Sequence, residues 1–267
     1  MSEIANPNKR PETTFEVAVS KDSFKFNAAH FVAFKGFRER LHGHNYKVHV
    51  RLLGSRHIGQ DGYVLDFGEL KAVVKKVCKD LNEYFICPMY SDVLTITEVK
   101  EQGEENDAGD GDGAGNVNLN LVCEDGTKFS FPKDDCAMLP IVHSTVEELA
   151  IYCWGQIILG LNAKYLRKRG IMTMEVTCSE AMGQEAVFRM DIPDTDDKED
   201  IMKVCDVKSY IMTGELFPKQ CLPTNVDKSQ KMSTTTNVLK SQKSSTIVHS
   251  AKEICGISCA DDNCCGK

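Results

Sequence analysis

The stretch LHGHNY (Leu41–Tyr46) runs directly into the alternating segment KVHVRL (Lys47–Leu52). Alternation of apolar and polar residues is typical of a β-strand with one buried face. Because successive side chains of a strand point to opposite faces, His42 and His44 face the same way, one strand step apart. The stretch therefore predicts a strand that directs two imidazoles toward one point.

A second alternating run, FKFNAAH (Phe24–His30), lies upstream and also ends in a histidine. If the two strands pair antiparallel, His30 comes to lie beside His42 and His44. Three neutral imidazoles without a fourth protein ligand are typical of catalytic zinc, whereas a structural zinc would require four ligands. A lone His-x-His pair more often consists of ordinary polar residues at a strand end, so the zinc interpretation needs support from the surrounding patterns.

The composition favours one domain with additional segments, since 42% of the 267 residues are hydrophobic and 27% are charged. A net charge of -7 and the lack of a basic stripe argue against a nucleic-acid partner. No apolar run approaches the roughly 20 residues that cross a bilayer, and the N-terminus lacks the apolar centre of a signal peptide. We therefore expect a cytoplasmic protein without membrane contact, whose 12 cysteines are mostly reduced thiols.

Two amphipathic helices are predicted, each behind a capping-box pattern. The first has apolar residues at helical spacing up to about Leu81, and it follows Asp66, with Glu69 three residues later. The second follows Thr145, with Glu148 three residues later. Both helices are expected to lie on a sheet.

Further strands and an insertion complete the predicted domain. Alternating segments at 172–178 and 185–190 predict a last strand pair, and those flanking Asp125-Gly126 predict a β-hairpin at about 117–132. The acidic, glycine-rich segment at about 101–115 predicts a flexible insert. A calcium loop is the alternative for its aspartates, but their spacing does not fit an EF-hand and no glutamate closes it.

Both ends of the chain are expected to lie outside the domain. Residues 1–14 show little periodicity, which predicts a flexible N-terminus. Residues 194–267 are rich in Ser, Thr and Lys and poor in apolar residues, which predicts a disordered tail. Its cysteines could bind a metal or accept a lipid, although free thiols are favoured. The predicted domain therefore spans 15–193.

The segments from Ser23 to His30 and from His42 to Tyr46 closely resemble the 6-pyruvoyl-tetrahydropterin synthases and the related 6-carboxytetrahydropterin synthases. The match to their HGHNY signature is specific, and the resemblance covers 15–193 apart from the insert and the hairpin. It implies the α+β tunnelling fold, with an antiparallel four-stranded sheet and two helices on one face, here with an inserted hairpin. It also implies a homo-oligomer, a trimer or hexamer, whose strands close into a barrel.

The resemblance also assigns site residues. It implies a zinc ion, Zn2+, bound by the histidines His30, His42 and His44. The carboxylate that anchors the pterin ring in the family corresponds to Glu180, and the family's Thr-x-Glu corresponds to Thr145 and Glu147. A carboxylate can accept both adjacent N–H donors of a 2-aminopyrimidinone edge.

The chain departs from the best-known members at the residues that transfer protons. Those members have a cysteine shortly before HGH and an Asp-His pair after the first helix. This chain has no cysteine in Lys35–Leu41 and has Asn82-Glu83 in the second place. A glutamate before HGH resembles a third class of these synthases, which cleaves the neopterin side chain to 6-hydroxymethyl-dihydropterin. Glu39 is the residue that fits, and its carboxylate would serve as general base.

The predicted function is a zinc-dependent pterin synthase, a lyase of tetrahydrobiopterin or folate biosynthesis that acts on 7,8-dihydroneopterin triphosphate. The product is 6-pyruvoyl-tetrahydropterin or 6-hydroxymethyl-dihydropterin, and the sequence leaves this choice open. Lys35, Arg38 and Arg40 are expected to meet the triphosphate. The alternative is a catalytically silent pterin-binding or regulatory protein that keeps the zinc site and the pterin anchor.

Overall fold

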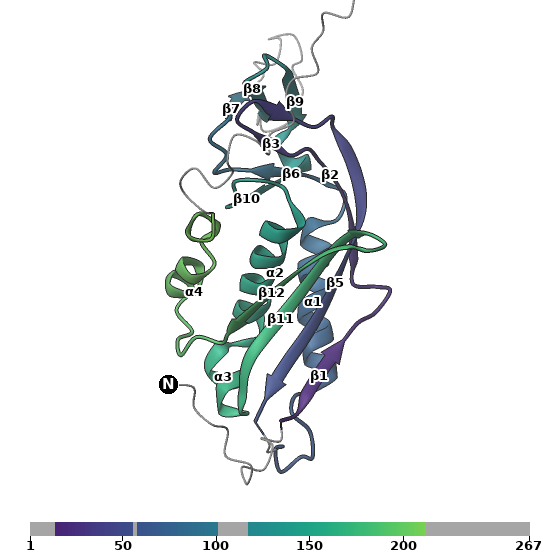
Figure 1. Ribbon diagram of the computed structural model, residues 1–267, viewed down its shortest axis with the longest axis vertical. Helices are drawn as coiled ribbons and strands as arrows, with labels where there is room; N and C mark the ends of the chain where they lie inside the picture. Colours follow the sequence, from purple (N-terminus) through teal and green to yellow (C-terminus); the bar gives the residue numbers. More distant parts are fainter. Residues whose placement is uncertain (1–13, 56–57, 101–116, 212–267) are drawn as a thin grey trace, which may run out of the picture. The chain divides into compact units, whose positions relative to one another are not determined.

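The computed structural model describes residues 14–55, 58–100 and 117–211 (Figure 1). By its internal contacts the chain divides into a unit of residues 1–214 and a second unit of residues 215–267, and the second unit lies outside the described residues. The predictions for residues 1–13, for the acidic insert at 101–115 and for the tail beyond residue 211 also fall outside the described part.

A mixed sheet forms the main layer of the fold. Its strands are β1 (Glu16–Val19), β2 (Lys25–His30), β5 (His42–Gly54), β6 (Tyr84–Pro88), β10 (Cys136–Leu139), β11 (Ile171–Ala181) and β12 (Gln184–Asp191). They lie in the order β10-β6-β2-β5-β11-β12, and β1 pairs with β5. The neighbours β2, β5, β11 and β12 are antiparallel, whereas β6 pairs in parallel with both β2 and β10.

The prediction of four strands is therefore wrong for the sheet as a whole, which has seven. The four antiparallel strands are present side by side at its β12 end, and the pattern analysis missed β6 and β10 beside them. In β6 the last four of the five residues are buried, so no apolar and polar residues alternate along it. A short strand that is covered on both faces lacks the period of two by which strands are recognised in a sequence.

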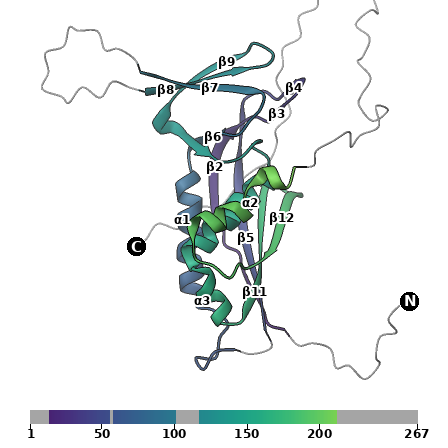
Figure 2. The same ribbon diagram turned by 90° about the vertical axis from the view of Figure 1, so that its left-hand side faces the viewer.

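The two predicted helices cover one face of this sheet. Figure 2 shows α1 (Phe67–Leu81), α2 (Val146–Leu161) and the short α3 (Ala163–Lys168) along the same side of β5 and β11. The start of α1 is capped by Asp66, which accepts a hydrogen bond from the Gly68 amide at 2.7 Å. The start of α2 is capped by Thr145, whose hydroxyl oxygen accepts from the Glu148 amide at 3.4 Å. Both helix starts agree with the prediction.

The core lies between the helices and the sheet. Alternate residues of β5, Val48, Val50 and Leu52, are buried there, as the alternating pattern predicts. From the helix side, Trp154 is fully buried and its indole N–H donates to the Met174 carbonyl oxygen at 2.9 Å. Because the long strands alternate so regularly, every second side chain of β5 reaches the helix-covered face.

A second, three-stranded sheet packs beyond the end of β2. It consists of β7 (Leu94–Lys100), β8 (Val117–Cys123) and β9 (Lys128–Pro132) in sequence order. The predicted hairpin is its β8–β9 pair, with Gly126 at φ 81° in the turn. The strand β7, which the sequence analysis missed, adds to the β8 side. Phe31 and Phe85 join Leu119 and Leu121 in the small core of this sheet.

Helical structure continues past Pro193, the residue at which the sequence analysis expected the domain to end. The helix α4 (Lys198–Val204) and the 3-10 turn η2 (Val207–Ser209) follow, and they bury Ile201 and Val207 against the main core. A helix of seven residues is too short to show apolar periodicity in the sequence. No helix among the described residues is long and apolar enough to cross a bilayer.

Candidate active site

The register between β2 and β5 brings three histidines together. His30 lies directly opposite His42, and Ala28 lies opposite His44, so His30 is also the diagonal neighbour of His44. The ring centroids are 4.6 Å apart for His30 and His42, 5.1 Å for His30 and His44, and 4.9 Å for His42 and His44. One possible ligand atom from each ring lies within 4.8 Å of the others. Gly43 keeps the strands close, because a Cβ there would lie 3.1 Å from the Ala28 carbonyl oxygen.

The ring of His30 is oriented for metal binding. Its Nδ1 lies 2.8 Å from the Ser144 carbonyl oxygen, which can only accept, so Nδ1 carries the proton and Nε2 has the free lone pair. Nε2 is buried without a hydrogen-bond partner, and burial lowers the pKa of His30. The second ligand candidate is held in the same manner, since His42 Nδ1 lies 2.7 Å from the Arg40 carbonyl oxygen. A buried lone pair directed among imidazoles fits a metal ion that prefers nitrogen ligands.

The loop that carries the Ser144 carbonyl is fastened by Glu148. This buried carboxylate accepts hydrogen bonds from the amides of Val142 at 2.7 Å and His143 at 3.0 Å. It also contacts His143 Nδ1 at 2.7 Å, and this bond raises the pKa of the His143 imidazole. The Ser144 hydroxyl donates to the Phe31 carbonyl oxygen at 2.8 Å. In a capping box the Glu148 side chain would accept a hydrogen bond from the Thr145 amide. Here it instead binds Val142 and His143, and so holds the loop before α2.

The His143–Glu148 bond predicts a pH-dependent stability. In the unfolded chain His143 titrates near 6.5, and in the folded chain its raised pKa keeps the proton to higher pH. The stabilisation is therefore complete below pH 6.5 and is lost as the pH rises through the raised pKa. At pH values below this range we expect His143→Gln to lower the melting temperature. At pH values above it, most of this effect should disappear. An effect of the same size at every pH would contradict the assignment.

A cavity of about 490 Å³ joins the histidines to most of the other predicted site residues. It is lined by His30, Val32, Glu39, His42, Thr145, Val146, Glu147, Glu180, Gly183, Gln184 and Glu185. His44 is not among the residues that line this cavity, but its Nε2 lies 3.9 Å from Oε2 of Glu180, which does line it. Sequence reasoning did not single out Val32, Gln184 and Glu185, because neither periodicity nor a known spacing marks them.

A local irregularity of β11 places Glu180 in this cavity. The register with β12 shifts between Ser179, which pairs with Glu185, and Ala181, which pairs with Gln184. Glu180 is the extra residue of this β-bulge, and bulges commonly redirect a side chain at the end of a strand. The start of α2 contributes its N-cap Thr145 and the first-turn residue Glu147 to the same cavity, so carboxylates from β11 and from α2 share it.

Glu39 reaches the cavity from the short loop between β4 (Phe37–Arg38) and β5. Its amide donates to the Val32 carbonyl oxygen at 2.9 Å, and its Oε2 accepts from the Val32 amide at 3.0 Å. These two hydrogen bonds with Val32 hold the Glu39 side chain in place, and the second carboxylate oxygen, Oε1, takes part in neither of them. Glu39 lies close enough for its charge to raise the pKa of His30 slightly, although burial dominates and lowers it.

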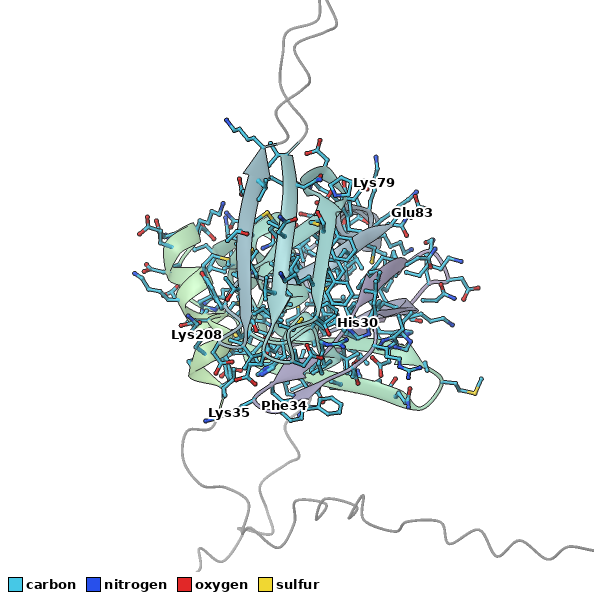
Figure 3. All side chains as sticks on the ribbon, turned by 90° about the horizontal axis from the view of Figure 1, so that it is seen from above. His30, Phe34, Lys35, Lys79, Glu83 and Lys208 are labelled. Carbon is cyan, nitrogen blue, oxygen red and sulfur yellow. The ribbon has the colours of Figure 1, made fainter. Side chains whose placement is uncertain are left out.

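The basic residues of this loop do not line the cavity. Arg38 is engaged by an ion pair with Asp125, with Nε 2.8 Å from Oδ2, so the expectation that it binds triphosphate is not supported by its contacts. Lys35 and Arg40 are exposed. Glu83, which follows α1, lines a separate cavity of about 630 Å³ together with His44. Figure 3 shows Glu83 well apart from His30, seen along the long axis.

Comparison with known proteins gives concordant matches. The family model described as 6-pyruvoyl tetrahydropterin synthase matches residues 18–191. A protein of Methanocaldococcus jannaschii, provisionally named a 6-carboxy-5,6,7,8-tetrahydropterin synthase, is 31% identical over 165 residues, which cover 62% of this chain and 89% of the relative. The crystal structure of the 6-pyruvoyl tetrahydropterin synthase from Plasmodium vivax is 46% identical, with a TM-score of 0.58, and the match covers 68% of this chain and 100% of that one.

Two further structures of the P. vivax synthase are each 45% identical to this chain, with TM-scores of 0.58, and cover 68% of it and 100% of their own length. They carry alanine or cysteine in place of a glutamate described as a catalytic residue. The family model spans well over half of the chain, and the relatives are matched over nearly their whole length. The chain therefore belongs to the 6-pyruvoyl tetrahydropterin synthase family.

Proposed function

We propose that this protein is a zinc-dependent pterin synthase that acts on 7,8-dihydroneopterin triphosphate, with Glu39 as the general base. The observation that carries the proposal is the single cavity in which His30 and His42 lie with Glu39 and Glu180. Membership of the family supports a pterin as substrate and a lyase reaction. Cleavage of the side chain would give 6-hydroxymethyl-dihydropterin, and loss of triphosphate would give 6-pyruvoyl-tetrahydropterin.

The metal would be held by His30, His42 and His44. The proposal is supported by the buried, unpartnered Nε2 of His30 and by the backbone carbonyl oxygens that orient the rings of His30 and His42. Three protein ligands leave a coordination position for the substrate. A zinc ion bound here would lower the pKa of a substrate hydroxyl and stabilise the negative charge that develops on its oxygen.

The pterin ring would be anchored by polar side chains that line the same cavity. Glu180 is half-buried and can accept the two adjacent N–H donors of the aminopyrimidinone edge in a bidentate pair. Thr145 accepts the Glu148 amide with its hydroxyl oxygen, which leaves the hydroxyl hydrogen free to donate to a substrate acceptor. Glu147 lies exposed in the first turn of α2 and lines the same cavity.

Glu39 would take the proton from a hydroxyl of the substrate side chain. As that proton leaves, the neighbouring carbon–carbon bond breaks and its electron pair passes into the conjugated pterin ring. A glutamate suits this task because a positioned carboxylate contributes roughly 10²–10⁴-fold as a general base. The P. vivax relative also has a glutamate described as catalytic, which supports the assignment.

The triphosphate is expected outside the cavity. The cavity contains the carboxylates of Glu39, Glu147, Glu180 and Glu185 and, among the described residues, no lysine or arginine lines it. The side chain of Arg40 is exposed. Arg40 lies beside the proposed metal ligands, since its carbonyl oxygen accepts a hydrogen bond from His42 Nδ1. It therefore replaces Arg38 as the cation of this loop that we expect to face phosphate.

Incubation of zinc-loaded protein with 7,8-dihydroneopterin triphosphate, followed by chromatographic separation of the products, tests the proposal. Formation of either pterin product supports it. Full zinc occupancy and pterin binding without turnover would refute it in favour of a catalytically silent pterin-binding protein.

A further inference from the structure

Glu39 directly follows a hairpin that is too short to be rigid by itself. Its strands β3 (Ala33–Phe34) and β4 (Phe37–Arg38) are each two residues long, and the turn contains Gly36 at φ 80°. Isolated two-stranded hairpins are at best marginally stable in water, even when they are longer. The position of Glu39 therefore depends on contacts that the hairpin makes with the rest of the protein.

Arg38 makes most of these contacts. Its Nε lies 2.8 Å from Asp125 Oδ2, its Nη2 donates to the Thr127 hydroxyl oxygen at 3.0 Å, and its Nη1 donates to the Glu39 carbonyl oxygen at 2.7 Å. The guanidinium also lies over the Phe129 ring, 5.7 Å from its centroid. The side chain is only 18% exposed, so water screens the ion pair less than it would at an open surface.

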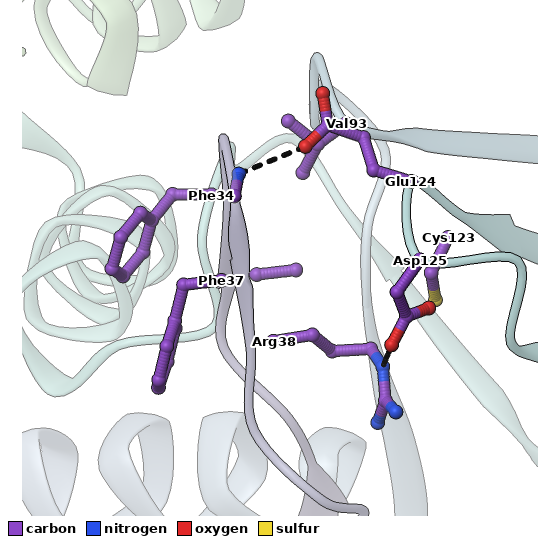
Figure 4. Close-up of a pocket in the computed structure, with 9 residues that line it drawn as sticks. Phe34, Phe37, Arg38, Val93, Cys123, Glu124 and Asp125 are labelled. Atoms are coloured by element: carbon purple, nitrogen blue, oxygen red, sulfur yellow. Dashed lines mark hydrogen bonds and ion pairs between the residues drawn. The ribbon is translucent and has the colours of Figure 1, made fainter. Parts of the chain in front are cut away.

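Apart from the Glu39 carbonyl oxygen, the partners of Arg38 all belong to the turn and the second strand of the β8–β9 hairpin. The same turn holds the tip of the β3–β4 hairpin, because the Gly36 amide donates to Glu124 Oε2 at 2.9 Å. Figure 4 shows Arg38 directed toward Asp125, whereas Phe34 and Phe37 lie on the other side of the hairpin. The β7–β9 sheet thus fixes both the tip and the end of the segment that leads into Glu39.

We propose that Arg38 is a positioning residue for Glu39, and that the β7–β9 sheet acts on the reaction through it. This inference rests on the proposed role of Glu39 as general base. A base must lie within hydrogen-bond reach of its proton, and a displacement of about 1 Å can cost on the order of 10²-fold in rate. Arginine suits the position because its rigid fork of donors can bind a carboxylate, a hydroxyl and a carbonyl oxygen at once.

The first test is Arg38→Ala, which should lower kcat roughly tenfold to a hundredfold by releasing Glu39. Zinc content should be unchanged, because the metal ligands do not contact Arg38. Arg38→Lys keeps the charge but lacks the fork, so it should restore little of the rate. Wild-type kcat in Arg38→Ala would overturn the proposal.

The decisive measurement places Arg38→Ala in a Glu39→Gln background. If Arg38 acts through the base, the double variant should be no slower than Glu39→Gln alone in single-turnover experiments. An equal fold-loss in both backgrounds would overturn the proposal and leave the role of Glu39 intact. A wild-type rate for Glu39→Gln alone would instead refute the base, so the two failures are distinguishable.

Two further variants keep the test informative if Arg38→Ala folds poorly. Asp125→Asn weakens the same contact from the β8–β9 turn and should show the same dependence on Glu39. Arg169→Ala is the matched control, because Arg169 is 17% exposed and likewise joins a carboxylate, Asp61, to a backbone oxygen, that of Val64. It should lower stability without changing kcat, and a fall in kcat equal to that of Arg38→Ala would mean that general destabilisation explains both.

Discussion

His42→Ala is expected to remove zinc from the protein and to abolish turnover. His42 provides one of three clustered imidazoles, with its ring centroid 4.6 Å from that of His30 and 4.9 Å from that of His44. Two remaining imidazoles do not hold a catalytic zinc ion, which normally has three protein ligands. Because His42 is exposed, its loss should leave the core intact. Elemental analysis of purified protein gives the zinc content, and added zinc should raise the melting temperature of the wild type only.

His49→Ala is the matched control for this prediction. His49 lies on the same strand, β5, but an odd number of residues from His42, so it faces the opposite side of the sheet. It should keep one zinc ion per chain and the wild-type rate. A full zinc stoichiometry in His42→Ala, with the control unchanged, would contradict the assignment of the metal ligands.

Glu39→Gln is expected to lower turnover by roughly 10²–10⁴-fold, the usual contribution of a positioned base. Glutamine keeps the shape of the side chain and can still accept the Val32 amide bond, which is 3.0 Å long in the wild type. It cannot accept a proton at neutral pH, so the loss reports on charge and basicity. Zinc content and pterin affinity should barely change, because the proposal assigns the metal to the histidines and the ring to Glu180.

Glu185→Gln separates the role of the base from the overall charge of the cavity. Glu185 lines the same cavity, and its substitution removes the same unit of charge. We expect a far smaller effect on turnover than for Glu39→Gln.

Glu39→Cys would restore the residue type of the better-known family members and is expected to shift the products toward 6-pyruvoyl-tetrahydropterin. Wild-type turnover in Glu39→Gln would place the base elsewhere.

Much of the fold could be predicted because its central elements carry strong periodic signals. The alternation in β5 predicts a strand with a buried face, and Val48 and Val50 are buried as expected. Asp66 and Thr145 mark the starts of α1 and α2 because a short polar side chain satisfies free amides there. Among the elements that escaped prediction, β6, β10 and α4 are short or lack a regular alternation.

The sequence by itself determined that His42 and His44 share one face of a strand, because side-chain alternation is a property of the backbone. Only the tertiary structure decided that His30 lies opposite His42, that a β-bulge turns Glu180 into the same cavity, and that Ser144 orients His30. It also decided that Arg38 binds Asp125, 87 residues away, and is therefore not available to a phosphate. Such contacts join segments distant in the chain, and their register and partners depend on packing that no local pattern encodes.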